Sequence, residues 1–304
     1  MGPSSRLSNG ACGPSQVVLR GTQANLIAYN TAMAEPFRRV DLTRVRSGVR
    51  VAALDRAATE EPLEVRLHNR PFAVIMRTPG ADRELAAGFL FAERVVAGAD
   101  DLGTIAHCRD AGAEHPENIV NVTLAGASAE TIDRLLAGRR QVTTNSSCGM
   151  CGRRTIESLA SDAAPLAAAW SVPAATIAAL PEQLRSRQDV FDETGGLHAA
   201  GLFSRDGRLV DVAEDVGRHN AVDKIVGRML MRDALPLSDS ILCVSGRTSF
   251  EIVQKAVFAG VPIVAAVSAP SSLAIDLAQE YGVTLIGFIR GDRFNIYAHA
   301  ERIL

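Results

Sequence analysis

Hydrophobic and polar positions in the first half of the chain predict a small unit of strands around one helix. Extended runs at residues 64–68 and 72–77 flank Asn-Arg-Pro and predict a hairpin. Apolar residues recur at helical spacing over 83–95, where Asp82 can cap the predicted helix. Two further strands are expected at 103–108 and 118–124, and a short helix at 129–136.

The last third of the chain alternates continuous apolar runs with amphipathic ones. This alternation is typical of a parallel sheet whose faces are covered by helices. Strands are predicted at 240–245, 262–268 and 283–289, and helices at 220–232, 249–258 and 272–281. Upstream, a helix is expected at 181–191, another at 155–160, and a hairpin at 197–204 and 208–213. Asp206-Gly207 between the hairpin's runs is a strong turn signal.

These patterns divide the 304 residues into an arm and two domains. Residues 1–45 start rich in Gly, Ser and Pro, show no sustained period and predict a poorly ordered arm. Residues 46–140 are expected to form a smaller α+β domain. Residues 141–304 are expected to form an α/β domain with a mostly parallel core sheet, and a cysteine-containing loop near its start.

Composition and charge exclude several classes of protein. Lysine plus arginine (32) nearly balances aspartate plus glutamate (34), and aromatic residues make up 5%, which argues against a nucleic-acid partner. No run reaches the ~18 apolar residues of a membrane span, and no signal-peptide pattern opens the chain. Five cysteines at irregular spacing do not form a disulfide framework and favour a reducing compartment. We therefore expect a cytoplasmic protein.

Cys148-Gly149-Met150-Cys151 is the chemical motif of the chain. A structural zinc site would need two more ligands, for which His107-Cys108 and Cys243 are poorly spaced candidates. A thioredoxin-like redox pair would sit after the first strand of a small domain, whereas this pair lies mid-chain. The pair could also transfer sulfane sulfur as reactive thiols, or be two buried apolar residues.

The surroundings of the pair favour a reactive thiolate. Gly149 and Gly152 allow a tight bend that leaves both sulfurs accessible. A predicted helix follows directly, and Arg153 and Arg154 add positive charge in its first turn. Such surroundings lower the pKa of a cysteine. The other cysteines have no such setting: Cys243 lies in an apolar strand and is expected in the core, Cys108 ends a predicted strand, and Cys12 lies in the predicted arm.

A comparison with zinc-dependent nucleobase deaminases fails. Those enzymes place H-x-E before P-C-x-x-C. Here His198-Ala199-Ala200 follows the cysteines, the glutamate is missing and no proline precedes Cys148. Without that carboxylate the chain lacks the general acid/base of hydrolytic deamination. A related scaffold stays possible, but deaminase activity does not.

Three loops next to predicted strands carry groups suited to phosphate. They are residues 245–249 with Arg247, residues 215–220 with Arg218 and His219, and residues 288–293 with Arg290 and Arg293. Ligands of open α/β sheets gather at the carboxyl ends of the strands, where Arg247 and Arg290 are expected. Together the loops indicate a phosphorylated or nucleotide ligand. None matches a P-loop or G-x-G-x-x-G.

Six blocks of sequence resemble the FdhD/NarQ family of formate dehydrogenase accessory sulfurtransferases. The blocks are SSCGMCG (146–152), GGLHAA (195–200), EDVGRHNAVDK (214–224), SGRTSFE (245–251), FIRGDR (288–293) and MRTPG (76–80). They span roughly residues 60 to 300. One departure is Glu93-Arg94, where the family commonly has Glu-Gly; it touches a helix end and not the cysteine motif.

The resemblance implies a homodimeric sulfur carrier required for formate dehydrogenase activity. It implies that persulfide sulfur comes from a cysteine desulfurase and passes to the molybdenum bis(molybdopterin guanine dinucleotide) cofactor before the formate dehydrogenase catalytic subunit receives it. Cys148 would bear the persulfide and Cys151 would be the second thiol. The implied fold is a cytidine deaminase-like three-layer sandwich. The expected cofactor-binding residues are Phe288, Ile289, Arg290, Gly291, Asp292, Arg293, Arg247 and His219.

Two alternatives stay open beside the sulfur carrier. One is a non-catalytic module that shields the cofactor or bridges desulfurase and dehydrogenase. The other is a structural protein in which the cysteine pair binds zinc. The sequence favours the carrier because its cysteine loop is polar and rich in glycine.

Overall fold

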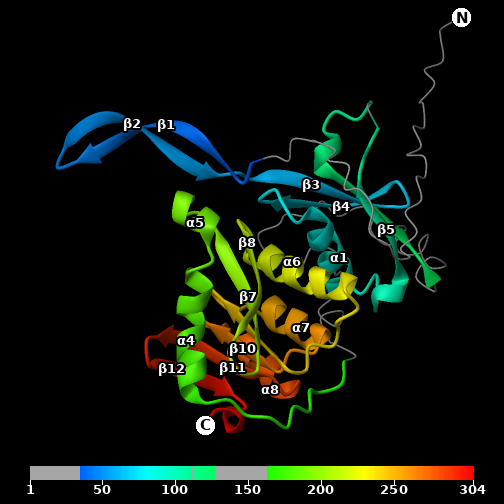
Figure 1. Cartoon of the computed structure of the whole chain (residues 1–304), viewed down its shortest axis with the longest axis vertical. Coiled ribbons are helices and arrows are strands. Elements are labelled where there is room, and N and C mark those ends of the chain that lie inside the picture. Colours follow the sequence, from blue (N-terminus) through cyan, green and yellow to red (C-terminus); the bar gives the residue numbers. More distant parts are fainter. Residues whose placement is uncertain (1–34, 111, 127–162) are drawn as a thin grey trace, which may run out of the picture.

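The computed structural model describes residues 35–110, 112–126 and 163–304, and Figure 1 shows their arrangement. Its largest element is a six-stranded sheet with the strand order β12-β11-β10-β9-β7-β8. The strands are β7 (His198–Ser204), β8 (Leu209–Asp215), β9 (Ser240–Val244), β10 (Ile263–Ala266), β11 (Thr284–Arg290) and β12 (Arg293–Ala298). The predicted hairpin and the three predicted apolar strands are all present.

The sheet is mixed, and the expectation of a mostly parallel sheet was wrong. Neighbours β9, β10 and β11 pair in parallel, whereas β12 with β11, β7 with β9 and β8 with β7 pair antiparallel. Gly291-Asp292 leaves too short a connection for a crossover, so β12 folds back beside β11. The β7–β8 hairpin adds antiparallel strands at the other side. Because no strand was predicted at residues 293–298, the expected share of parallel pairs was too high.

Helices cover both faces of this sheet. On one face lie α6 (Arg218–Met231), α7 (Phe250–Ala259) and α8 (Ser272–Glu280), and on the other lies α4 (Ala174–Arg185). Successive strand residues point to opposite faces. Leu242 and Val244 therefore join the core under α6–α8, while Cys243 joins the core under α4. Cys243 is fully buried, which confirms its prediction as a core residue, and this burial raises the pKa of its thiol to about 12.

The prediction of one helix at residues 181–191 gave the wrong bounds. Helix α4 begins seven residues earlier, at Ala174, and contains Pro181. A second short helix, α5 (Asp189–Thr194), follows after a break. Ile177, Leu180 and Leu184 are buried at helical spacing against the sheet. This burial stabilises the helix on both sides of the proline and offsets the lost backbone hydrogen bond.

A four-stranded sheet is built from the first half of the described chain. It has the order β4-β3-β6-β5, with β3 (Glu61–Leu67), β4 (Arg70–Arg77), β5 (Leu102–His107) and β6 (Ile119–Leu124). Helix α1 (Asp82–Ala92) packs between this sheet and α6. These elements match the predicted strands and helix. Asp82 does not cap α1, however, because its carboxylate binds the buried guanidinium of Arg77 through two hydrogen bonds of 3.0 Å.

A two-stranded hairpin precedes the four-stranded sheet and extends away from the rest of the described chain (Figure 1). Strands β1 (Phe37–Arg46) and β2 (Val49–Ala58) pair antiparallel over their whole length. The prediction of an arm without structure through residue 45 was therefore wrong for residues 37–45. Ser47 and Gly48 both have positive φ, which matches the turn to the twist of the two strands.

Several predictions lie outside the described residues. These are the helices at 129–136 and 155–160, the Cys148–Cys151 loop, Cys12 and the domain boundary near residue 140. Within the described part of the chain, no helix is long and apolar enough to cross a membrane.

Candidate functional site

The three predicted anion loops lie at one edge of the six-stranded sheet. Strand β8 runs in the same direction as β9, β10 and β11, so their carboxyl ends meet at this edge. Residues 215–220 follow β8, residues 245–249 follow β9, and residues 288–293 end β11. Helices α6 and α7 both begin here, which points their amide groups toward the same region. The topology thus brings together loops that are far apart in the sequence.

His198 belongs to this edge although the sequence analysis assigned it no role. It begins β7, which runs opposite to β9, and so lies beside the loop that follows β9. The next residue, Ala199, donates its backbone N–H to the Ser245 hydroxyl at 2.9 Å. The His198 ring lies close to position 246, since a Cβ on Gly246 would lie 3.1 Å from Nδ1 and the ring would have to shift by a few tenths of an ångström. Glycine there lets the loop pass close to the imidazole.

The electrostatic surroundings of His198 are positive. Burial lowers the pKa of its imidazole, and the charges of Arg218, His219 and Arg247 lower it further against the opposing charge of Asp215. The imidazole therefore stays neutral near pH 7. A neutral ring can donate one hydrogen bond and accept another. It can thus donate a hydrogen bond to an anion, or accept a proton and become cationic.

Two polar groups at this edge have their hydrogen-bonding capacity unused. Among the described residues, Arg218 Nε and Thr248 Oγ1 are buried and make no hydrogen bond. Thr248 lies at the start of α7, and Arg218 is the first residue of α6. Arg247 lies in the loop between β9 and α7 and is exposed. Buried polar groups normally find a partner, so an anion here would satisfy donors that the described chain leaves free.

In the turn at residues 288–293, most residues are exposed to solvent and one is buried in the core. Phe288 is exposed with a positive φ, and a register shift between Gly287 and Arg290 marks a bulge. Arg290 is exposed, and its Nη1 donates to the Val267 carbonyl at 2.6 Å, which fixes the guanidinium over the end of β10. Gly291, Asp292 and Arg293 are also exposed. Ile289 is 2% exposed and belongs to the core, so its side chain does not face the edge.

His219 lies in the protein interior, beneath the loops at this edge. The ring is buried, and its Nε2 lies 3.0 Å from the Ser249 hydroxyl and 2.9 Å from the Glu251 carboxylate. These contacts join the first turns of α6 and α7. The structure therefore places His219 where it orients the two helix starts, and its Nε2 is already engaged within the protein.

Two of the sequence blocks that resemble the family, residues 76–80 and 214–224, meet in a buried polar network. The Asp215 carboxylate accepts from Lys224 Nζ at 2.7 Å and from the Thr78 backbone N–H at 3.2 Å. Lys224 Nζ also donates to the Thr78 carbonyl at 3.0 Å, and the Thr78 hydroxyl accepts from the Val216 N–H at 3.2 Å. This network ties the end of β4 to the loop that carries Arg218. The sequence singled out both blocks but contained no signal that they touch.

A cavity of about 600 Å³ opens beside the edge. His198, Ser245 and Val267 line it at the ends of the strands, and on the other side it is lined by α4, by Gln188 just before α5, and by Phe191 of α5. Its volume is within the range of small-molecule sites. The guanidinium of Arg185 lies 4.7 Å from the centre of the Phe191 ring at its border. A ligand of nucleotide size could lie in the cavity with its phosphates toward the arginines.

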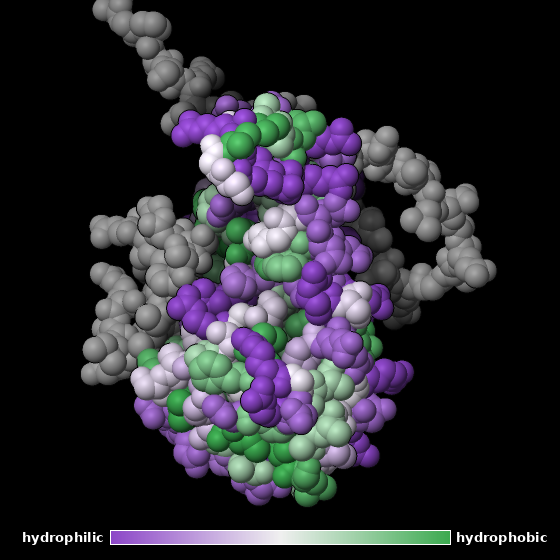
Figure 2. Space-filling view, turned by 90° about the vertical axis from the view of Figure 1, so that its left-hand side faces the viewer, coloured by the Kyte–Doolittle hydropathy of each residue, from purple (hydrophilic) through white to green (hydrophobic). Residues whose placement is uncertain are grey.

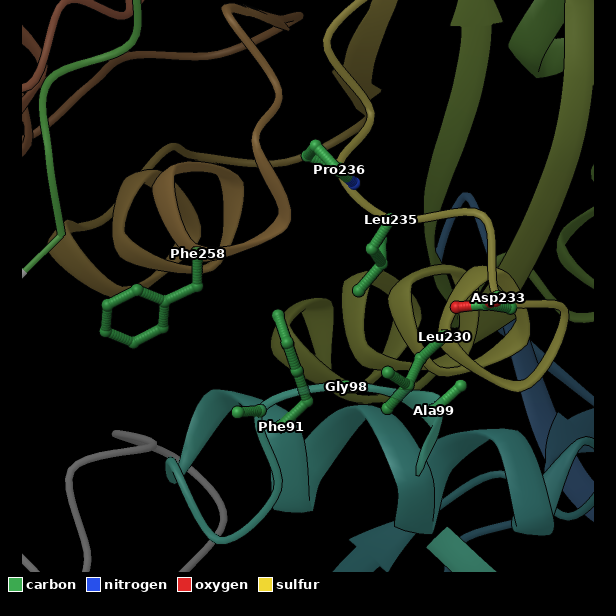
Figure 3. A pocket seen from close by; sticks show the side chains of 9 residues that line it. Phe91, Gly98, Ala99, Leu230, Asp233, Leu235, Pro236 and Phe258 are labelled. Carbon is green, nitrogen blue, oxygen red and sulfur yellow. The ribbon is translucent and has the colours of Figure 1, made fainter. Parts of the chain in front are cut away.

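A second cavity, of about 240 Å³, is lined mainly by apolar residues (Figure 3). Phe91, Leu230, Leu235 and Phe258 line it from α1, from the end of α6 and the segment that follows, and from the end of α7. Because α6 and α7 begin at the anion loops, their ends lie away from that edge. Asp233 is its one ionisable lining residue. The edge with His198 is therefore the candidate functional site.

Comparisons with known proteins agree with one another. The sequence profile of the FdhD/NarQ family matches residues 58–304. The chain is 52% identical over 258 residues to a sulfur carrier protein FdhD of Anaeromyxobacter dehalogenans, covering 83% of this chain and 90% of the relative. It is 50% identical over 277 residues to a sulfur carrier protein FdhD of Streptomyces coelicolor, covering 89% and 97%.

A solved structure shares the fold. It is the crystal structure of a candidate formate dehydrogenase accessory protein from Desulfotalea psychrophila, 28% identical in sequence. The superposition has a TM-score of 0.70 and covers 89% of this chain and 100% of the other. The mixed α/β architecture is thus that of a known protein.

Proposed function

The chain belongs to the FdhD/NarQ family, and from this premise we propose that it is a sulfur carrier that serves formate dehydrogenase. The observation that carries the proposal is its likeness, over more than four fifths of its length, to relatives named sulfur carrier proteins. The cysteine pair supplies a chemical group suited to that role. The cationic edge of the sheet supplies a place for an anionic acceptor.

The proposed chemistry begins at Cys148. Its thiolate attacks the outer sulfur of a persulfide on a cysteine desulfurase, the S–S bond breaks, and the desulfurase cysteine leaves as a thiolate. Cys148 then carries the persulfide, and the exchange involves no net oxidation or reduction. Cys151 is the second thiol, able to receive the outer sulfur by the same exchange. The reducing conditions of the cytoplasm, where we expect the protein to act, keep both thiols available.

The proposed acceptor is the molybdenum bis(molybdopterin guanine dinucleotide) cofactor, bound as a substrate before the formate dehydrogenase catalytic subunit receives it. Its pyrophosphates are anionic and suit the guanidinium groups of Arg247, Arg290 and Arg293. The unused Arg218 Nε adds a buried donor. Gln188 and Phe191 offer an amide and an aromatic ring in the adjoining cavity. His198, neutral near pH 7, lies between the cavity and the arginines.

Sulfur labelling tests the proposal. The full chain is incubated with cysteine desulfurase and cysteine carrying labelled sulfur, and intact mass spectrometry measures the mass of one added sulfur atom. We expect the label on the wild type and on the control Cys12→Ala, and its loss from Cys148→Ala. Complex formation with desulfurase and dehydrogenase but without protein-bound sulfur would instead support the adaptor. Stoichiometric zinc that disappears in Cys151→Ala would overturn the thiol chemistry.

A further inference from the structure

Helix α5 forms one wall of the cavity of about 600 Å³ and has no buried face of its own. None of residues 189–194 is buried, whereas α4, which precedes it, buries three side chains against the sheet. Figure 2 views the side of the molecule on which α4 and α5 lie in Figure 1, and hydrophilic and hydrophobic residues are intermixed there. Because buried apolar surface normally fixes a helix against a sheet, polar contacts must hold α5 in place.

The Glu214 carboxylate makes two of these contacts. Its Oε2 accepts a hydrogen bond from the backbone N–H of Val190 at 3.0 Å, and its Oε1 accepts one from the N–H of Phe191 at 2.8 Å. Both amides belong to the first turn of α5, where N–H groups have no partner within the helix. Hydrogen bonds to an ionised acceptor are about twice as strong as neutral ones. Glu214 therefore fixes the first turn of α5 against the end of β8.

Two further contacts of α5 lie at the surface. Arg185 pairs with Asp192, and Arg56 of β2 pairs with Glu193, and all four side chains are at least 40% exposed. Exposed ion pairs contribute little to stability, because water screens the charges and both side chains lose conformational freedom. The half-buried Glu214 carboxylate is thus the main polar attachment of α5 in the described part of the chain.

The electrostatic surroundings of Glu214 indicate that its charge acts on α5. Burial raises the pKa of its carboxyl, the hydrogen bonds from Val190 and Phe191 lower this pKa, and the charges of Asp189 and Asp192 raise it again. The two amide hydrogen bonds are therefore what stabilises the carboxylate here. A carboxylate also repels an anionic ligand, and Glu214 does not line the cavity.

Glu214 and its neighbour Asp215 act on opposite sides of the sheet. Successive strand residues point to opposite faces. Asp215 binds Thr78 and Lys224 on the side of α6, while Glu214 binds the first turn of α5 on the side of α4. The end of β8 thus organises both sides of the candidate site.

We propose that Glu214 is a positioning residue of the candidate site. By holding the first turn of α5, it keeps Phe191 and Gln188 in the wall of the cavity, where the aromatic ring and the amide contact the base of a nucleotide ligand. Glu214 does not touch the ligand and acts only through α5. The inference rests on the proposed function, since it takes the guanine dinucleotide part of the acceptor as the occupant of this cavity.

Binding of guanosine diphosphate to the full chain, measured by isothermal titration calorimetry, tests the proposal. This nucleotide carries the base and the pyrophosphate of the proposed acceptor. We expect Glu214→Ala to weaken binding about tenfold or more, because both hydrogen bonds to α5 are lost. Glu214→Gln keeps one carbonyl oxygen as an acceptor and should weaken binding less. The matched control is Glu280→Ala at the exposed end of α8, which should bind as the wild type does.

Two further measurements separate positioning from a general loss of structure. Hydrogen exchange at the amides of Val190 and Phe191 should become faster in Glu214→Ala, whereas exchange at Ala200 within β7 should not change. In a chain that carries Gln188→Ala and Phe191→Ala, adding Glu214→Ala should cause little further loss of binding, because the groups that Glu214 positions are already absent.

Unchanged or stronger nucleotide binding in Glu214→Ala, or a further loss in the triple variant as large as in the single one, would overturn the role of Glu214. Fluorescence of Trp170, the single tryptophan, reports whether each variant is folded. If Glu214→Ala is not folded, Glu214→Gln decides: weaker binding supports the role, and unchanged binding overturns it.

The carrier function is tested separately. A wild type that does not bind guanosine diphosphate would overturn the assignment of the cavity and the role of Glu214 together. A wild type that binds the nucleotide but gains no sulfur on Cys148 would instead refute the carrier function and leave the role of Glu214 supported.

Discussion

At the scale of single residues, buried ionic contacts determine where the candidate site lies. Asp215 and Lys224 are almost fully buried and pair at 2.7 Å, and both also bind the backbone of Thr78. Through Asp215, the loop with Arg218 is held against the end of β4. The buried pair is therefore a positioning device for the cationic edge.

Removing one member of this pair should be costly. In Lys224→Met the Asp215 carboxylate stays buried without its cation, and we expect the free energy of unfolding to fall by about 3–5 kcal/mol. Urea denaturation measures the change. The control is Arg205→Met, whose partner Asp239 lies 3.9 Å away in an exposed pair and whose loss should have no measurable effect. Equal losses in the two variants would contradict the role given to the buried pair.

At the scale of elements, the crossing of α1 and α6 joins the two larger sheets. Gly88 of α1 and Gly227 of α6 allow the closest approach. A Cβ on Gly88 would lie 1.9 Å from the Asp223 carbonyl oxygen, and one on Gly227 would lie 1.9 Å from the Glu84 carbonyl oxygen. Both obstacles are backbone, which cannot rotate away. Any side chain at either position must push the helices apart.

Alanine substitution tests this crossing. Alanine favours an isolated helix over glycine by about 1 kcal/mol, but here we expect Gly88→Ala and Gly227→Ala to lower the free energy of unfolding by about 1–3 kcal/mol or more through overpacking. Thermal and chemical denaturation provide the measurement. Gly98→Ala is the control, because its Cβ would meet no atom within 4 Å and its φ is extended. Stabilisation of the Gly227 variant would show that the helices can separate freely.

At the scale of the whole molecule, one hydrophobic core connects the two larger sheets. Leu63 and Val120 of the four-stranded sheet belong to the same cluster of buried residues as Leu242 and Leu285 of the six-stranded sheet. The α1–α6 packing lies within that cluster. The two halves therefore depend on each other for burial of their apolar faces.

A shared core predicts a single cooperative unfolding transition. Fluorescence of Trp170, which packs against the core beneath α4, should change at the same denaturant concentration as circular dichroism of the whole chain. Gly88→Ala, made in the first half of the chain, should shift both signals equally. Two separate transitions, with Trp170 unaffected by the substitution at Gly88, would show independent domains instead.

Local periodicity predicted most of the elements. The alternation of strand and helix after residue 218, the hairpin with Gly207 at its turn and the core position of Cys243 all follow from neighbours within a few residues. The errors were also local in origin. Pro181 was read as a helix start, and β1 was missed because its four arginines interrupt the apolar residues, which do not alternate regularly.

The sequence by itself determined the family, and it singled out the cysteine motif and the three loops predicted to bind an anion. Only the tertiary structure decided that these loops share an edge, that His198 joins them, and that Ile289 and His219 turn inward. The physical reason is that period and propensity depend on residues a few positions apart. Strand order and helix crossing depend instead on burial and pairing between residues more than a hundred positions apart, such as Thr78 and Asp215.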